Sequence, residues 1–188
     1  MALWGISTSD ESKPKYLTAA QKENTFADAR GWVYRDPNTG LEEVLVAVGG
    51  LSGIATRTGL AAPTISSIKF VTSALAAGDT VVTVDVIYNE GVTVTTTGGT
   101  PTIVVANGDE SGDGNGNYTL SYTGTGSTKN RKRFTATGLT ISEADVLTLG
   151  GADIVLNGGT LTDTVDGSTA ASVAVSALDD VTVTVAAA

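Results

Sequence analysis

Residues 64–188 consist largely of short β-branched segments separated by turn residues, and this pattern restricts the possible folds more than any other feature of the chain. In "TVVTVDVIY" (80–88), Val82, Val84 and Val86 alternate with Thr83 and Asp85, which is the two-residue period of a strand with one buried face. Similar runs recur mostly at intervals of 8–12 residues: "TISSIKF", "VTVTTT", "TIVVA", "YTLSYT", "KRFTATG", "VLTLG", "DIVLNG", "LTDTV", "SVAV" and "VTVTV". Many short strands without intervening helices predict a two-sheet antiparallel β-sandwich over residues 63–188.

The preceding residues predict a small α+β region. In "LTAAQKENTFADARG" (17–31), Thr18 followed by Gln21 matches a capping box, and Gly31 stands where a helix C-terminal cap is expected. The turn signal "DPNTG" then separates "WVYR" from "EVLVAV", which predicts a β-hairpin of Trp32–Arg35 with Glu43–Val48. Gly49–Pro63 is interpreted as a linker or an extended arm. The predicted domains are therefore 1–62 and 63–188.

Histidine and cysteine are absent from the chain. Their absence excludes disulfides, imidazole or thiolate metal ligands, and a Ser-His-Asp triad. Any catalysis would have to rest on carboxylates, Lys, Tyr or hydroxyls. We therefore expect a non-enzymatic protein without catalytic residues or a cofactor.

The net charge of −9 is placed unevenly. Residues 1–62 carry six basic and seven acidic groups, whereas residues 63–188 carry five and thirteen. An acidic domain repels polyphosphate, so nucleic acid is not an expected partner. The first residues lack the pattern of a signal peptide, and no run approaches the roughly 20 apolar residues that span a bilayer, so we expect synthesis in the cytosol and no membrane partner.

The segment "NGDESGDGNGNY" (107–118) is the most site-like stretch. Counted from Asp109, an EF-hand loop would have ligands at Ser111 and Asp113 and a glycine at Gly114, but its twelfth position is Leu120, which cannot ligate calcium. The segment that follows is a strand, which also excludes a phosphate-binding loop. Two interpretations stay open: a polar hairpin connection without a metal, or a looser calcium site in which Asp109 or Asp113 is joined by a distant Asp.

The run "KNRKR" is the sharpest charge feature of the acidic region. Lys129, Arg131, Lys132 and Arg133 are candidate contacts for an acidic surface of a neighbouring subunit. No aromatic ladder accompanies them, which argues against a nucleic-acid footprint. The alternative is a solvated hairpin, or an edge strand whose charges block edge-to-edge pairing.

Aromatic residues are concentrated near the N-terminus, where five of the ten lie within the first 34 positions. They form either a small core or an interface anchor, and the two roles are compatible. The candidate partner-binding set is Trp4, Tyr16, Phe26, Trp32 and Tyr34. The paired carboxylates Glu42/Glu43, Asp109/Glu110 and Asp179/Asp180 are interpreted as solubilising charge, because aromatic residues for a sugar platform are scarce.

Two resemblances follow from these residues. The segments "DTVVTVDVIYNEGVTVTTTGGTPTIVVANG", "YTLSYTGTGS" and "ADIVLNGGTLTDTVDGSTA" resemble the immunoglobulin/cadherin-like repeats of bacterial adhesins and phage structural proteins, over roughly residues 64–185; "KNRKRF" departs from that pattern. The N-terminal "WG", "PKYLT" and "GWVYR" are similar to the start of small virion structural proteins of contractile-tailed bacteriophages, notably cyanophages.

These resemblances imply a mainly β protein with an Ig-like sandwich, located on the phage head surface. The implied function is capsid decoration or cement: residues 1–62 dock on the major capsid protein and stabilise the shell. A homo-oligomer is also implied, and a trimer in particular, because decoration proteins often sit on local threefold axes. The alternatives are a neck, tail or fibre-associated adhesion protein that contacts the host surface and, from a third class, a carbohydrate-active enzyme.

Overall fold

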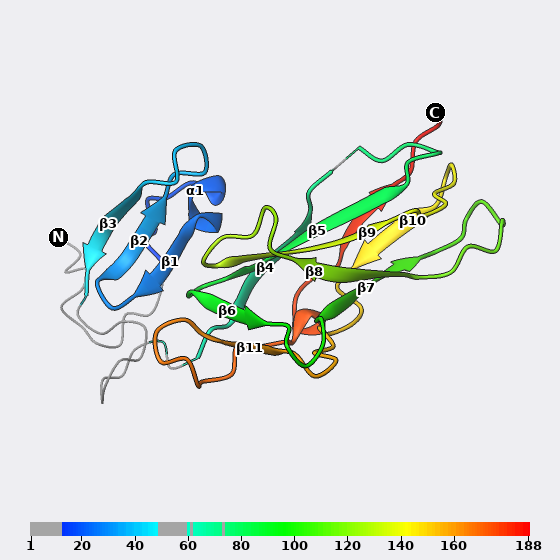
Figure 1. Ribbon diagram of the computed structural model, residues 1–188. Coiled ribbons are helices and arrows are strands. Elements are labelled where there is room, and N and C mark those ends of the chain that lie inside the picture. Colours follow the sequence, from blue (N-terminus) through cyan, green and yellow to red (C-terminus); the bar gives the residue numbers. More distant parts are fainter. Residues whose placement is uncertain (1–12, 49–59, 61, 73) are drawn as a thin grey trace.

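The computed structural model describes residues 13–48, 60, 62–72 and 74–188. Within this part of the chain the fold is mainly β, with three antiparallel sheets and one short α-helix (Figure 1). No helix here has the length and apolarity needed to cross a membrane. The elements are α1 (Ala19–Glu23), β1 (Thr25–Asp28), β2 (Gly31–Arg35), β3 (Glu42–Ala47), β4 (Ile65–Phe70), β5 (Val81–Tyr88), β6 (Val92–Thr95), β7 (Thr102–Asn107), β8 (Tyr118–Thr123), β9 (Arg131–Thr137), β10 (Val146–Leu149), β11 (Thr160–Asp163), the 3₁₀ turn η1 (Val175–Ala177) and β12 (Val181–Thr184).

The N-terminal sheet has the order β1-β2-β3 and follows directly on α1. The predicted capping box is confirmed, because Thr18 accepts from the backbone of Gln21 and the Gln21 side chain bonds back to the Thr18 amide. The predicted helix is too long, however: it is capped at Asn24, and Thr25–Asp28 is a strand. Pairing of this segment with β2 overrides a weak helical pattern.

Gly31 is not a helix cap but the first residue of β2. Its φ of 126° lies in a region that glycine adopts far more readily than other residues. A Cβ at this position would lie 2.1 Å from the Val46 carbonyl oxygen. Glycine is therefore required because β3 passes close to the start of β2.

The predicted hairpin is confirmed as β2 and β3. Asp36 closes the turn, since its Oδ1 accepts from the amide of Asn38 at 2.7 Å and its own amide donates to the Leu41 carbonyl at 2.9 Å. Gly40 has a φ of 74°, the left-handed conformation that the turn requires.

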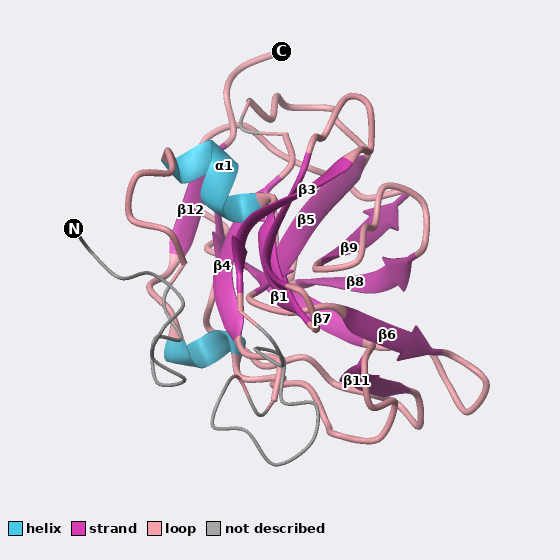
Figure 2. Ribbon diagram, turned by 90° about the vertical axis from the view of Figure 1, so that its left-hand side faces the viewer, coloured by secondary structure: helices cyan, strands magenta, loops and turns pink. Residues whose placement is uncertain are grey.

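The rest of the described chain forms a seven-stranded sheet, of order β12-β10-β7-β8-β9-β5-β4, and a two-stranded sheet of β11 and β6. The outermost strands β12 and β4 of the large sheet approach each other, which makes the arrangement sandwich-like and close to a barrel (Figure 2). The prediction of a mainly β, antiparallel sandwich is confirmed. Two predicted strands are wrong: "DIVLNG" makes only an isolated bridge at Val155, and "SVAV" leads into η1.

The core lies between the large and small sheets. The predicted buried face of β5 is confirmed, because Val82, Val84 and Val86 are buried in this core with Phe134 and Leu161. The opposite face is not left to solvent, however, since Asp85 and Ile87 are buried as well. The N-terminal sheet has its own small cluster, in which Trp32 packs with Ala27, Val48 and Leu60. Figure 1 places this sheet at one end of the molecule and the β7–β8 connection at the other.

Candidate functional site

The basic run lies at the start of β9, a strand in the middle of the large sheet, so the alternative of a protected edge strand is wrong. Arg133 makes a two-pronged ion pair with Asp85, with Nε at 2.8 Å from Oδ1 and a terminal nitrogen at 2.9 Å from Oδ2. Arg131 Nε lies 3.6 Å from the same carboxylate, which is 1% exposed. The hydrogen bonds that Arg133 donates to the Asp85 carboxylate raise the pKa of Arg133. These two guanidinium groups therefore have a buried partner within the chain.

Lys132 lies on the opposite face of β9, on the side of the buried Phe134. Its Nζ donates to the Thr128 carbonyl at 2.7 Å, and burial lowers the pKa of the amine to about 8. A lysine with 5% of its surface exposed offers little to a partner protein.

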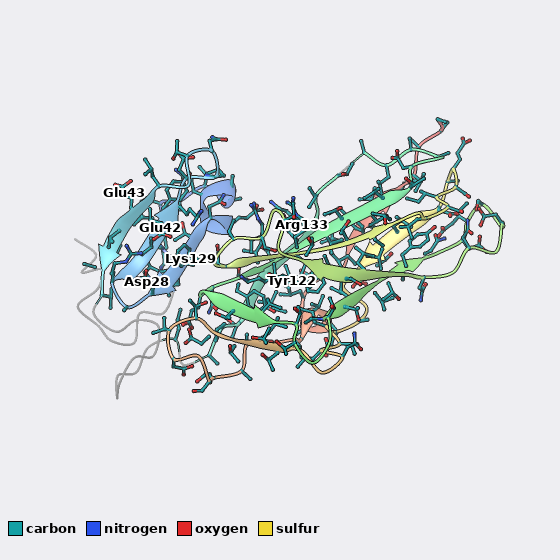
Figure 3. The ribbon with its side chains drawn as sticks, viewed as in Figure 1. Asp28, Glu42, Glu43, Tyr122, Lys129 and Arg133 are labelled. Atoms are coloured by element: carbon teal, nitrogen blue, oxygen red, sulfur yellow. The ribbon has the colours of Figure 1, made fainter. Side chains whose placement is uncertain are left out.

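Lys129 connects the large sheet to the N-terminal sheet. Its Nζ lies 2.7 Å from Glu42 Oε1 and 5.8 Å from the centre of the Phe26 ring. Arg30 bonds to both Asp28 and Glu42, at 2.6 and 2.8 Å. Figure 3 shows Asp28, Glu42 and Lys129 gathered at this junction. Glu42 is thus a shared acceptor for cations from both parts of the chain.

Backbone and amide contacts complete the junction. The Ala27 amide donates to the Asn89 carbonyl at 2.7 Å, which joins the edge of β1 to the end of β5. The Asn130 side-chain amide donates to the Glu23 carbonyl at 3.0 Å and to the Tyr88 carbonyl at 3.2 Å. A further ion pair links the Glu23 and Lys69 side chains. The N-terminal sheet is therefore fixed to the large sheet by directional polar contacts.

A cavity of about 220 Å³ opens beside this junction. Its lining is largely apolar and comes from β1, from the turn after it and from the loops next to β6 and β11: Phe26, Ala27, Asp28, Ala29, Arg30, Gly91, Lys129, Thr164 and Val165. Cations at its rim and an aromatic ring in its wall are the features of a pocket that can hold an apolar group next to an anion.

The N-terminal aromatic residues divide between core and surface. Phe26 and Trp32 are each 1% exposed, which assigns them to the interior, whereas Tyr34 is partly buried and Tyr16 is 68% exposed. Trp4 lies outside the described residues. Of the described aromatic candidates, Tyr16 is thus the one most available to a partner.

The acidic loop brings together three carboxylates at the far end of the molecule. Oxygens of Asp109, Asp113 and Asp145 all lie within 4.8 Å of one another, and Asp145 supplies the distant Asp that the open calcium interpretation requires. Carboxylate oxygens are ligands that calcium prefers, and three of them would provide part of the six to eight that it takes.

Hydrogen bonds within the loops account for this cluster. Asp145 accepts from the Ser111 amide at 3.0 Å and from Asn107 Nδ2 at 3.1 Å. Burial acts to raise the pKa of Asp145, but these hydrogen bonds outweigh it and the pKa is lowered. The Ser142 hydroxyl donates to Asp113 and lowers the pKa of that carboxyl. The cluster fastens the β7–β8 connection to the segment before β10, and β7 and β8 pair as an antiparallel hairpin on either side of the acidic loop.

Comparison with known proteins returned no matching family model, no matching curated protein and no matching solved structure. Sequence reasoning did not identify the intrachain partners Glu42, Asp85 and Glu23. The one available signal was Asp85, the single charged residue in the strand-like run "TVVTVDVIY".

Proposed function

We propose that this chain is a non-enzymatic structural protein of a bacteriophage particle, a head decoration protein that binds the capsid surface and stabilises the shell. The proposal starts from the resemblance of "WG", "PKYLT" and "GWVYR" to the beginning of virion structural proteins. The total absence of histidine and cysteine supports a structural function over catalysis.

One structural observation carries the proposal furthest. Six large apolar side chains of the described residues are exposed, and three of them, Tyr16, Leu41 and Val44, lie in the short N-terminal region. Exposed apolar groups concentrated in one small region favour an interaction surface over random placement. The region that carries the resemblance is thus also the region best suited to docking.

The mechanism is mass action. A protein that binds only the assembled shell, and spans neighbouring capsid subunits, stabilises that shell in proportion to its occupancy. Standard-sized contacts of about 800 Å² per partner would suffice for stable attachment. The polar junction with the large sheet then holds the acidic β-sandwich on the outside of the particle.

Binding to stripped particles tests this proposal. The purified chain should sediment with heads from which it has been removed, and Tyr16→Ser or Val44→Ser should weaken binding at least about tenfold, as expected for interface anchors. Val155→Ser changes an exposed apolar side chain of the β-sandwich, and this variant should bind as the unaltered chain does. Failure of the unaltered chain to bind heads would contradict the proposal.

The number of copies of this chain per particle distinguishes a head decoration protein from a neck, tail or fibre protein. A head decoration protein occupies a lattice and should be present in on the order of hundreds of copies per particle, whereas a neck, tail or fibre protein follows a lower symmetry. Quantitative mass spectrometry of purified particles distinguishes the two.

A further inference from the structure

The junction cavity combines an apolar interior with an accessible cationic rim. Phe26 and Ala27 form buried parts of its wall, and Gly91 and Thr164 line another part of it. The Arg30 and Lys129 side chains at the rim are 48% and 44% exposed. An apolar side chain could enter this cavity with its neighbouring groups close to two cations.

The charged residues that line the cavity differ in net sign from the whole chain. They are the carboxylate Asp28 and the cations Arg30 and Lys129, which leaves one positive charge at the lining in a chain of net charge −9. A partner that brings a carboxylate would be attracted to this rim. The complementary group is therefore an exposed apolar side chain with a carboxylate beside it.

The chain itself displays such a pair at the start of β3. Leu41 is 73% exposed, the highest fraction among the large apolar side chains described. Glu43, two positions further, is also exposed. Leu41 immediately precedes β3 and its carbonyl accepts from the Asp36 amide, and Glu43 is the second residue of β3, so both exposed side chains lie at the same end of the hairpin.

We propose that Leu41 of one copy inserts into the junction cavity of a second copy, and that Glu43 of the first pairs with Lys129 or Arg30 of the second. Leu41 and the cavity are separate sites of one chain, so the contact is made twice in a two-fold dimer, or once per neighbour in a head-to-tail ring. This inference goes beyond the proposed function and does not depend on it, since the contact forms without a capsid. A single anchor of this kind gives a weak contact, which a lattice of neighbouring copies would reinforce.

Two variants separate the two halves of the contact. Leu41→Ser removes the inserted side chain and keeps the cavity, whereas Ala29→Trp fills the cavity and keeps Leu41. Each variant alone should have an association constant at least about tenfold below that of the unaltered chain. Mixed in equal amounts, the two should form dimers that stop at two copies, because one partner supplies only the side chain and the other only the cavity.

Sedimentation velocity over about 10 μM to about 1 mM measures this association. Val155→Ser and Ala20→Trp, at exposed positions away from the cavity, are the matched controls and should associate as the unaltered chain does. Circular dichroism establishes that each variant is folded, and Leu41→Ser alone decides the outcome if Ala29→Trp does not fold. The inference would be overturned if the unaltered chain stays monomeric over this concentration range, or if both variants associate as the unaltered chain does. It would also be overturned if Leu41→Ser weakens binding to heads but leaves self-association unchanged.

Discussion

At the scale of single residues, the basic side chains of the run "KNRKR", predicted as partner contacts, bind groups within the chain. Asp85 is buried and holds two guanidinium groups, and Lys132 is buried with a backbone carbonyl as its partner. A buried charge is tolerated only when it is paired, so removal of one partner costs more than the pair itself contributes. These residues should therefore be probed first as stability elements.

Replacement of Asp85 by Asn should destabilise the fold by about 2–3 kcal/mol, because the shape is kept while Arg133 and Arg131 lose their anion. Urea denaturation measures the free energy of unfolding. Glu143→Gln removes an exposed carboxylate and serves as the control. Equal urea midpoints for Asp85→Asn and Glu143→Gln would show that the buried ion pair makes no net contribution to the free energy of unfolding.

Lys132 should make stability depend on pH on the alkaline side. Its pKa is lowered to about 8 in the folded state, against about 10.4 in an unfolded chain, so between these values the unfolded state binds more protons and stability rises with pH. Lys132→Met removes this contribution. The free energy of unfolding of the variant, relative to the unaltered chain, should fall from pH 8 to pH 10; a constant difference would contradict the assignment.

At the scale of elements, local signals predicted most strands and the β2–β3 hairpin, because alternation and turn residues act over a few positions. The capping box at Thr18 was predictable for the same reason. The strand β1 was not, since Thr25–Asp28 is extended only because β2 lies beside it. The partners of the basic run were also hidden, because Asp85 meets Arg133 through the register of β5 and β9, which are far apart in the sequence. No sequence pattern specifies that register by itself.

Gly31→Ala tests the close approach of β2 and β3. The new Cβ would collide with the Val46 carbonyl and strain a φ of 126°, so the N-terminal sheet should lose about 3 kcal/mol or more. Fluorescence of the buried Trp32 follows its unfolding. Gly138→Ala, which also has a positive φ but open space around it, should cost only about 1 kcal/mol. Similar losses in both would show that backbone strain, and not the β3 contact, requires glycine at 31.

At the scale of the whole molecule, the junction sets how the N-terminal sheet is presented. Burial acts to raise the pKa of Glu42, but hydrogen bonds from Lys129 and Arg30 outweigh it, so the pKa lies below its usual value. A carboxyl with a lowered pKa contributes stability above about pH 4.3 and loses it as the pH falls further.

Glu42→Gln should weaken the junction by about 1–2 kcal/mol at neutral pH. Because the variant lacks the titrating carboxylate, its junction should lose less stability than that of the unaltered chain when the pH is lowered below about 4.3. Hydrogen exchange of the Ala27 amide, which bonds across the junction to Asn89, reports its opening. Glu143→Gln changes an exposed carboxylate outside the junction and should leave this exchange unchanged. Equal protection in both variants would show that Glu42 does not hold the junction.

The temperature at which phage heads disrupt is the most direct measure of the proposed function, the stabilisation of the head by this chain. Heads stripped of the chain should disrupt several degrees below complete heads, and adding back the purified chain should restore the original temperature. The Tyr16→Ser variant should restore it only at higher concentration, in line with its weaker binding. Stripped and complete heads that disrupt at the same temperature would contradict the stabilising function.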